Sequence, residues 1–292
     1  IIEFLVLFLY AYKLLPTAAT MKLLRFDWSP IVPVLKFSFS IAFGTISWIL
    51  VTQLDKLLLS KLLTLEAYGY FTLGVVAASG VMLISAPISL ALIPRMTKLE
   101  AEGKEAEFVL IYRMCSQIVA LFAGSIAITV LLHSRTIIYA WTGNIEIPES
   151  TSEIFLLYTI GNCLMALSSF SYYLQYAKGD LKLHVLGNIF LIIILIPIVI
   201  KSALDYGGLG AGYAWMGVNF FFLITWVPVV HSKFIPSLNK NWFSYDLGIV
   251  IFSSLAGGYF ANAISPVFEG RWYPLLGVAV TGFSALGAGF CF

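Results

Sequence analysis

The chain has 292 residues, of which 60% are hydrophobic and only 11% are charged, and its formal net charge is +2. An ordinary soluble domain has about 45–50% apolar and 25% charged residues, so this composition excludes a water-soluble globular protein and indicates an integral membrane protein. The apolar residues occur in runs of about 20, the length that a helix needs to cross the hydrocarbon core, and this pattern favours helices over a β-barrel. The small net charge indicates no particular partner.

The ends of the chain and its cysteines add two expectations. The chain begins at Ile1 inside an apolar run and ends on GAGFCF, which we interpret as a fragment cut at both ends. Cys115, Cys163 and Cys291 lie in apolar runs without C-x-x-C or Cys/His spacing. They therefore predict neither a disulfide framework nor a zinc site, and we expect them to act as small buried hydrophobic groups.

In chain order, the apolar runs predict one partial membrane span and then eight full ones. The partial span ends near Tyr12, and the polar segment KLLPTAATMKLLRFDWSP separates it from the first full span. The full spans are expected at residues 37–58, 67–93, 108–132, 154–176, 185–200, 209–230, 247–264 and 273–292.

Lys and Arg alternate between the connections that join these spans. The first, third, fifth and seventh connections hold ten of these cations, and the other connections hold four. The positive-inside rule places the first set in the cytoplasm. The connection from His133 to Glu153 carries three glutamates against one arginine, and it is predicted to be the longest outer loop, at 20 residues or so.

The first full span ends in QLDKLLLSK (residues 53–61). On a helix, one face would collect the following neighbouring positions: Thr45, Trp48, Thr52, Asp55, Lys56 and Ser60. An ionisable side chain in a membrane is costly unless it is paired or hydrated, so Gln53, Asp55 and Lys56 are expected to border a hydrated cavity. The alternative is that Asp55 and Lys56 mark the end of the span at the interface, where long side chains reach water.

Two later spans carry further polar candidates. Arg113 and Gln117 lie one turn apart in the span 108–132, where Arg113 is either a cavity cation or an ordinary interfacial one. In the span 154–176, Tyr158, Asn162 and Tyr173 belong to a polar aromatic stripe. Such a stripe could stack on and hydrogen bond to a sugar, although aromatic packing between helices explains it equally well.

Proline and glycine mark positions where the helices bend or approach closely. Pro87 and Pro197 interrupt two spans and are candidate hinges, or else fixed kinks that help packing. Gly208 and Gly212, within GGLGAG, form a small-x-x-x-small pair that lets two helices approach. A dinucleotide site is not predicted, because Tyr213 occupies the last glycine position of that pattern and no strand precedes it.

Catalytic signatures are missing from the sequence. It contains no G-x-S-x-G, no H-E-x-x-H and no Walker loop, and its three histidines are isolated at span ends. We therefore expect no enzyme, no catalytic residue, no metal site, no cofactor and no nucleic-acid partner. Without a nucleotide site, transport would be downhill or driven by a Na⁺ or H⁺ gradient.

Two stretches resemble a known family. They are TQLDKLLLSKLLTLEAYGYFTLGVVAA with the later ISLALIPRMTKL, and YYLQYAKGDLKLHVLGNIFLIIILIPIVI followed by GGLGAGYAW. Both are similar to the second half of bacterial polysaccharide or O-antigen flippases, in the multidrug/oligosaccharidyl-lipid/polysaccharide exporter superfamily. The likeness extends over residues 20–230.

The resemblance implies an all-α polytopic membrane protein, and more specifically the second six-helix bundle of a MATE-like transporter with about 12–14 helices. Residues 1–31 would be the end of a preceding helix and a cytoplasmic connection. Residues 32–232 would form the bundle, and residues 233–292 would form two additional C-terminal helices.

The resemblance also implies a function. The protein would flip an undecaprenyl-pyrophosphate-linked oligosaccharide, such as an O-antigen or exopolysaccharide repeat unit of lipopolysaccharide or polysaccharide biosynthesis, across the bacterial inner membrane by alternating access. Lys56 and Arg113 would be head-group cations, and Asp55 would be their partner or an ion-coupling carboxylate. The implied partners are the lipid-linked oligosaccharide, the lipid bilayer and the N-terminal half of the same protein, together with a polysaccharide polymerase and a chain-length regulator.

Two other functions stay open. A drug or cation antiporter of the same superfamily would share the fold, but its cavity should favour carboxylates, and Asp55 is the one acidic candidate within these spans. A membrane polysaccharide polymerase or glycosyltransferase would need a large outer loop or acidic metal-binding loops, which the connection 133–153 does not offer.

Overall fold

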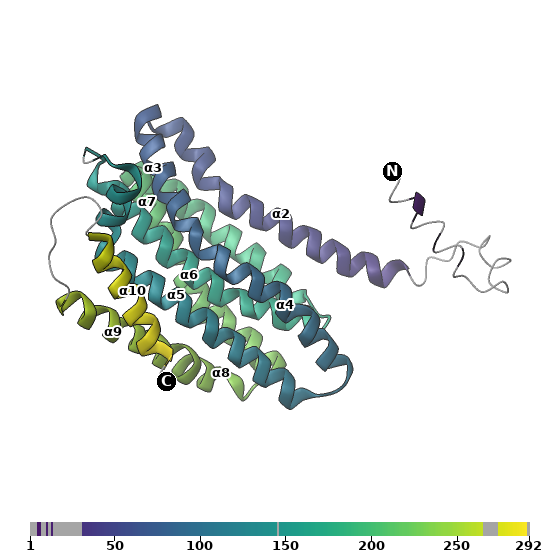
Figure 1. Cartoon of the computed structure of the whole chain (residues 1–292). Helices are drawn as coiled ribbons and strands as arrows, with labels where there is room; N and C mark the ends of the chain where they lie inside the picture. The colour runs from purple at the N-terminus through teal and green to yellow at the C-terminus, as the bar shows by residue number, and fades with distance from the viewer. Residues whose placement is uncertain are drawn as a thin grey trace. The chain divides into compact units, whose positions relative to one another are not determined.

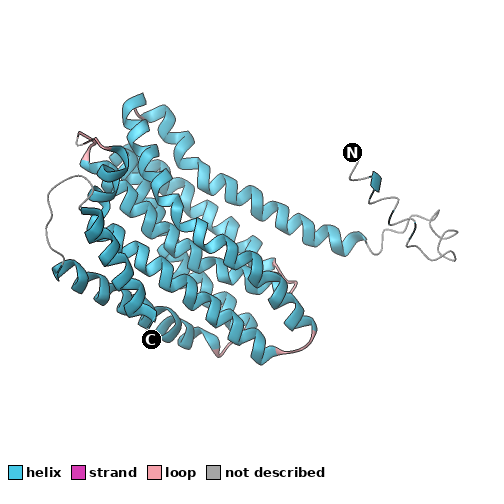
Figure 2. Ribbon diagram, viewed as in Figure 1, coloured by secondary structure: helices cyan, strands magenta, loops and turns pink. Residues whose placement is uncertain are grey.

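In the computed structural model, every regular element among the described residues is a helix, and the described connections between helices are short (Figures 1 and 2). The described residues are Leu5, Val6, Tyr10, Lys13 and the ranges 31–144, 146–264 and 274–290. Residues 43–292 form one compact unit and residues 1–42 form another, and the packing described below is that of the larger unit. Most of the predicted partial span before Tyr12 lies outside the described residues.

The helices follow the predicted spans. Their bounds are α2 Ile31–Leu62, α3 Leu65–Ala78, the 3-10 turn η2 Ser79–Val81, α4 Met82–Ala101, α5 Glu105–Thr142, α6 Glu149–Ala177, α7 Lys182–Phe234, α8 Leu238–Asn241, the π-helix η3 Trp242–Ile249, α9 Val250–Ile264 and α10 Pro274–Phe290. Four of the described helices are long and apolar enough to cross a membrane, or five if the bent pair of α3 and α4 counts as one span. The chain is thus an all-α polytopic membrane protein, as its composition predicts.

Helix α7 is 53 residues long and folds back on itself. The reversal occurs at Gly207, whose backbone has φ 60° and ψ −135°, a conformation accessible almost only to glycine. On either side of it, a Cβ on Gly187 would collide with the indole of Trp226, and the ring of Phe190 stacks on that of Phe221 at 6.5 Å. The two arms of α7 are therefore antiparallel, and they correspond to the predicted spans 185–200 and 209–230.

One predicted boundary is wrong. Helix α5 does not stop before His133 but continues through a kink there, with φ −132° and ψ 17°, and ends at Thr142. Gly143, with φ 71°, terminates the helix, so the connection to α6 runs only from 143 to 148. The apolar run TIIYAW after His133 explains the difference, because it continues the helix beyond the polar residues that interrupt it.

Ion pairs join three cation-rich connections at one end of the unit. The Nζ atom of Lys178 lies 2.7 Å from Oε2 of Glu100, and Nζ of Lys233 lies 2.7 Å from Oδ2 of Asp180. The hydrogen bond that Lys233 donates lowers the pKa of Asp180 below its ordinary value. These pairs connect the segments after α4, α6 and α7, so the structure reproduces the alternation that the distribution of Lys and Arg predicts.

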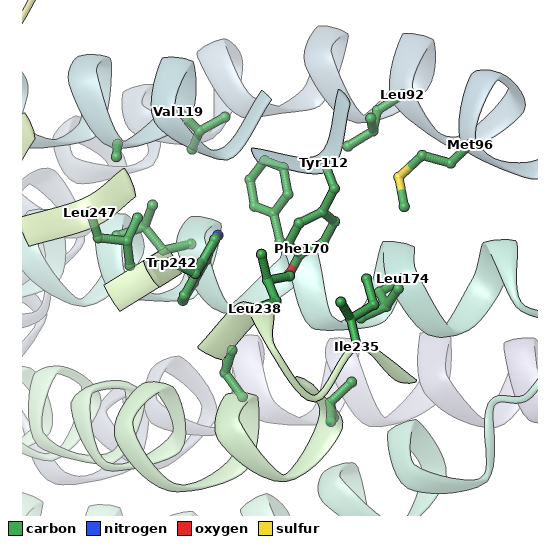
Figure 3. Close-up of a cluster of buried hydrophobic side chains, with 14 of the residues drawn as sticks. Leu92, Met96, Tyr112, Val119, Phe170, Leu174, Ile235, Leu238, Trp242 and Leu247 are labelled. Atoms are coloured by element: carbon green, nitrogen blue, oxygen red, sulfur yellow. The ribbon is translucent and has the colours of Figure 1, made fainter. Parts of the chain in front are cut away.

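Two large apolar clusters and a smaller third one pack the described helices against one another. The first fills the space between α4, α5, α6 and the segment after α7, where Tyr112, Phe170 and Trp242 are fully buried (Figure 3). The rings of Tyr112 and Phe170 meet edge to face at 5.7 Å. The second cluster joins α2, α3, α5, α6 and both arms of α7 around Phe71 and Trp215.

Gly208 and Gly212 lie where α7 approaches other helices closely, as their small-x-x-x-small spacing predicts. A Cβ on Gly208 would lie 3.0 Å from Cδ2 of Phe71, and one on Gly212 would lie 2.9 Å from Cδ1 of Leu157. The close approach of α7 to α3 and α6 is therefore confirmed.

The two prolines lie inside helices. Pro87 is in α4, close to the 3-10 turn at which α3 and α4 are bent by 40° relative to each other. Pro197 is exposed in the first arm of α7. Both positions are compatible with a hinge or with a fixed kink, so their role as hinges stays a prediction.

Candidate functional site

Helix α2 has two distinct faces around Asp55. The buried face carries Gly44, Ser47, Val51, Asp55 and Leu59, at steps of three and four. The other face carries what we call the polar stripe of α2: Thr45, Trp48, Thr52, Lys56 and Ser60, which are half-buried or exposed. The single stripe predicted from the sequence is therefore wrong for Asp55, because neighbours on a helix point about 100° apart.

The carboxylate of Asp55 is buried, with 5% of the residue exposed, between α2 and α6. The hydroxyl of Tyr158 donates a hydrogen bond to its Oδ2 atom, and the backbone N–H of Lys56 donates to Oδ1 at 2.7 Å. A carboxylate in an apolar interior needs such donors. Asp55 thus interacts with the bundle, and the ammonium of its neighbour Lys56 points elsewhere.

The ammonium of Lys56 is bound by neutral acceptors of its own helix. Its Nζ atom donates to the backbone oxygen of Thr52 at 3.1 Å and to Oε1 of Gln53 at 3.4 Å. Within the described part of the chain, no carboxylate lies within ion-pair distance of Lys56. Its ammonium is therefore hydrogen bonded to neutral acceptors without forming a salt bridge among the described residues.

The Asp55–Tyr158 pair continues into a wider buried network. The ring of Tyr158 stacks on Trp215 at 6.1 Å, and the indole N–H of Trp215 donates to Oδ1 of Asn162 at 3.0 Å. The side-chain amide of Asn162 donates in turn to the backbone oxygen of Ala78 at 2.9 Å, where α3 gives way to the 3-10 turn. The network thus connects α2, α6, α7 and the bend between α3 and α4.

Arg113 and Gln117 take part in a second polar cluster, which involves Asp246. Nε of Arg113 donates to Oδ2 of Asp246 at 2.7 Å and Nη2 donates to Oδ1 at 2.8 Å, while Nε2 of Gln117 donates to Oδ1 at 2.7 Å. The side chain of Asp246 has no exposed surface, and that of Arg113 is 35% exposed. The structure thus places both candidates beside a carboxylate from η3, away from the polar stripe of α2.

Tyr173 lies in an aromatic group on α6. Its ring meets those of Phe170 and Tyr172 edge to face at 5.5 Å and 5.8 Å. These contacts are intramolecular, so the packing alternative for this aromatic stripe accounts for the geometry of Tyr173.

Two important residues were not among the sequence candidates. Asp246 lies just before an apolar run, and an acidic residue at the start of a span could have been paired with the cation of another span. Trp215 follows the GGLGAG segment, and a tryptophan within a span, away from the interfaces, was a signal of a hydrogen-bonded indole. No group of three or more His, Cys, Asp or Glu side chains suited to a metal occurs among the described residues.

The fold and the site define a polytopic helical membrane protein with buried polar networks and one cationic, exposed helix face. The sequence model of the family described as polysaccharide biosynthesis protein matches residues 1–144. This match confirms the resemblance to polysaccharide-related membrane proteins, and it includes Asp55, Lys56, Arg113 and Gln117. It ends before α6, whereas the likeness seen in the sequence continues to residue 230. Searches of curated proteins and of solved structures found no match.

Proposed function

We propose that the protein flips a lipid-linked oligosaccharide, with an undecaprenyl-pyrophosphate carrier, across the bacterial inner membrane by alternating access. The family match supports the polysaccharide part of this proposal. The observation that carries the rest is the state of Lys56, a cation on the polar stripe of α2 without a carboxylate partner among the described residues. A pyrophosphate group is bound by such cations, whereas a charged side chain that faces lipid costs free energy.

In the proposed mechanism, each candidate residue has a role that follows from its contacts. Lys56 would contact the pyrophosphate, and Gln53 would hold its ammonium in place. Asp55 and Tyr158 would fix α2 against α6, and Asn162 would connect this contact to the bend before α4. Transport would need no cofactor and would be downhill or coupled to a Na⁺ or H⁺ gradient. The N-terminal half of the protein would supply the opposite wall of the cavity, and a polymerase and a chain-length regulator would act on the flipped product.

Complementation tests the proposal. The gene of the full-length protein is expressed in a bacterium that lacks its O-antigen flippase, with wild type, Lys56→Gln and Lys61→Gln compared at equal membrane levels. Lys61 is the matched control, because it is an exposed lysine at the end of the same helix. We expect wild type and Lys61→Gln to restore surface glycan and Lys56→Gln to lose most of it.

Two results would contradict the proposal. If Lys56→Gln restored surface glycan as well as wild type, the cation would have no part in transport. If wild type failed to restore glycan but conferred drug resistance, the antiporter function would replace the flippase function.

A further inference from the structure

The cluster around Asp246 joins α5 to the C-terminal helices through side chains that are far apart in sequence. Asp246 lies on η3, the π-helical segment that leads into α9, and it accepts hydrogen bonds from both Arg113 and Gln117 of α5. Its side chain has no exposed surface, so all of its interactions are with the protein. A buried carboxylate that accepts two parallel N–H bonds from a guanidinium and a third from an amide has a strongly preferred position.

Further hydrogen bonds support the same contact on the side of the apolar core. The indole N–H of Trp242, on η3, donates to Oγ of Ser116 at 2.9 Å. The hydroxyl of Tyr112 is hydrogen bonded to Nε2 of His231 at 2.7 Å, and Nδ1 of His231 lies 3.3 Å from Oδ1 of Asn239, on α8. Figure 3 shows Tyr112 and Trp242 in this core, and the ring of His231 contacts both of theirs edge to face.

We propose that Arg113 and Gln117 lock the C-terminal helices to α5, so that α9 stays docked on the bundle as the protein changes conformation. Arg113 is then a positioning residue whose charge is used by Asp246, and it does not hold the transported anion. This inference goes beyond the proposed function, since it holds for whatever substrate is moved.

A disulfide reporter can measure the docking directly. A Cβ on Gly124 would lie 3.7 Å from Cβ of Ser254, so α5 and α9 are within the distance range of a disulfide at this pair. Gly124→Cys and Ser254→Cys are introduced together in the full-length protein, with Cys115, Cys163 and Cys291 replaced by Ala. Membranes are oxidised for increasing times, the protein is denatured, and the remaining thiols are labelled with maleimide-polyethylene glycol.

The reporter is then compared in Arg113→Met, Asp246→Leu and the double variant. Either single substitution leaves one member of the pair without its partner, whereas the double variant removes both charges. We expect each single variant to slow cross-linking by roughly two- to hundredfold, the range of couplings within one hydrogen-bonded network, and the double variant to be faster than the worse single one. Arg95→Met, which removes an exposed cation from α4, is the matched control and should leave the rate unchanged.

The lock is overturned if the single variants cross-link at the wild-type rate, or if the effects of the two substitutions simply multiply in the double variant. If Arg113→Met or Asp246→Leu is not inserted into the membrane, Arg113→Lys is used as a further variant. It keeps the charge but cannot make the paired hydrogen bonds, so cross-linking should be slower than in wild type, and an unchanged rate would also overturn the lock. Because the readout is a cross-link, failure of the flippase proposal leaves this test unaffected.

Discussion

Gly161 on α6 is the position where the polar network is most sensitive to one added methyl group. A Cβ there would overlap Cδ1 of Trp215 and would lie 2.8 Å from its Nε1 and 3.3 Å from its Cγ. The indole would have to move, although it is held by its hydrogen bond to Asn162 and by its stack on Tyr158. Gly161→Ala should therefore displace Trp215 from both partners.

The size of the effect follows from three contributions. Overpacking a buried interface costs about 1–3 kcal/mol. Loss of the bond between Trp215 and Asn162 adds about 0.5–1.5 kcal/mol. Alanine in place of glycine within a helix restores about 0.5–1 kcal/mol. We expect Gly161→Ala to destabilise the protein by a net amount of about 0.5–4 kcal/mol, which combines these ranges.

The assay is thermal unfolding of the purified protein in detergent, followed by the fraction that stays monodisperse in size-exclusion chromatography. Gly217→Ala is the control, because Gly217 lies on the same arm of α7 as Trp215 and a Cβ there meets no atom within 4 Å. We expect Gly217→Ala to melt at or above the wild-type temperature. In a Trp215→Phe background, Gly161→Ala should cost less than in wild type, because the smaller ring leaves space. A Gly161→Ala protein as stable as wild type would refute the reasoning.

Three further predictions concern the same described part of the chain. Tyr158→Phe should destabilise the protein by about 1.5–3 kcal/mol, the contribution of a hydrogen bond to a charged group, because buried Asp55 keeps only a backbone donor; detergent unfolding of this variant tests it. Gly207→Ala should lower the melting temperature although its nearest neighbour is 3.5 Å away, because the strain of about 1–3 kcal/mol lies in the backbone. The pKa of Asp180 is lowered in the folded state, so the stability that Lys233 provides is present above the ordinary value of 3.8 and is lost as the pH falls below it. The pair is partly exposed and contributes at most about 1 kcal/mol, so Lys233→Met should lower the melting temperature slightly at pH 7 and by less at pH 3.

The helical architecture could be predicted because the length and the apolar content of the sequence runs are themselves the properties that define a membrane-spanning helix. Each of the eight predicted spans overlaps a described helix or helix arm, although only four or five of the described helices are long and apolar enough to cross a membrane. The glycines at 208 and 212 mark a real close approach. The end of α5 was missed because a polar residue at His133 was treated as a boundary, whereas a helix tolerates a local kink when the following residues are apolar.

The site was less predictable because its pairs are distant in sequence. Arg113 and Asp246 are 133 positions apart, and nothing in either segment specifies the other. The orientation of Asp55 was difficult to predict for a different reason. The face of a helix is broad, and a stripe read at steps of three and four can include a residue that belongs to the adjacent buried face.

The direction of the Lys56 side chain separates the two interpretations of this lysine. Helix α2 ends at Leu62, roughly 9 Å further along its axis at 1.5 Å per residue, so a lysine that reached for the nearest interface would extend toward that end. Its ammonium instead donates to Thr52 and Gln53, which lie toward the middle of the helix. An ammonium has three donors, and the two acceptors that Lys56 uses here are neutral. The geometry therefore places the cation on the half-buried or exposed face of α2, opposite the buried face that carries Asp55, where an anionic head group would be the partner that α2 itself does not provide.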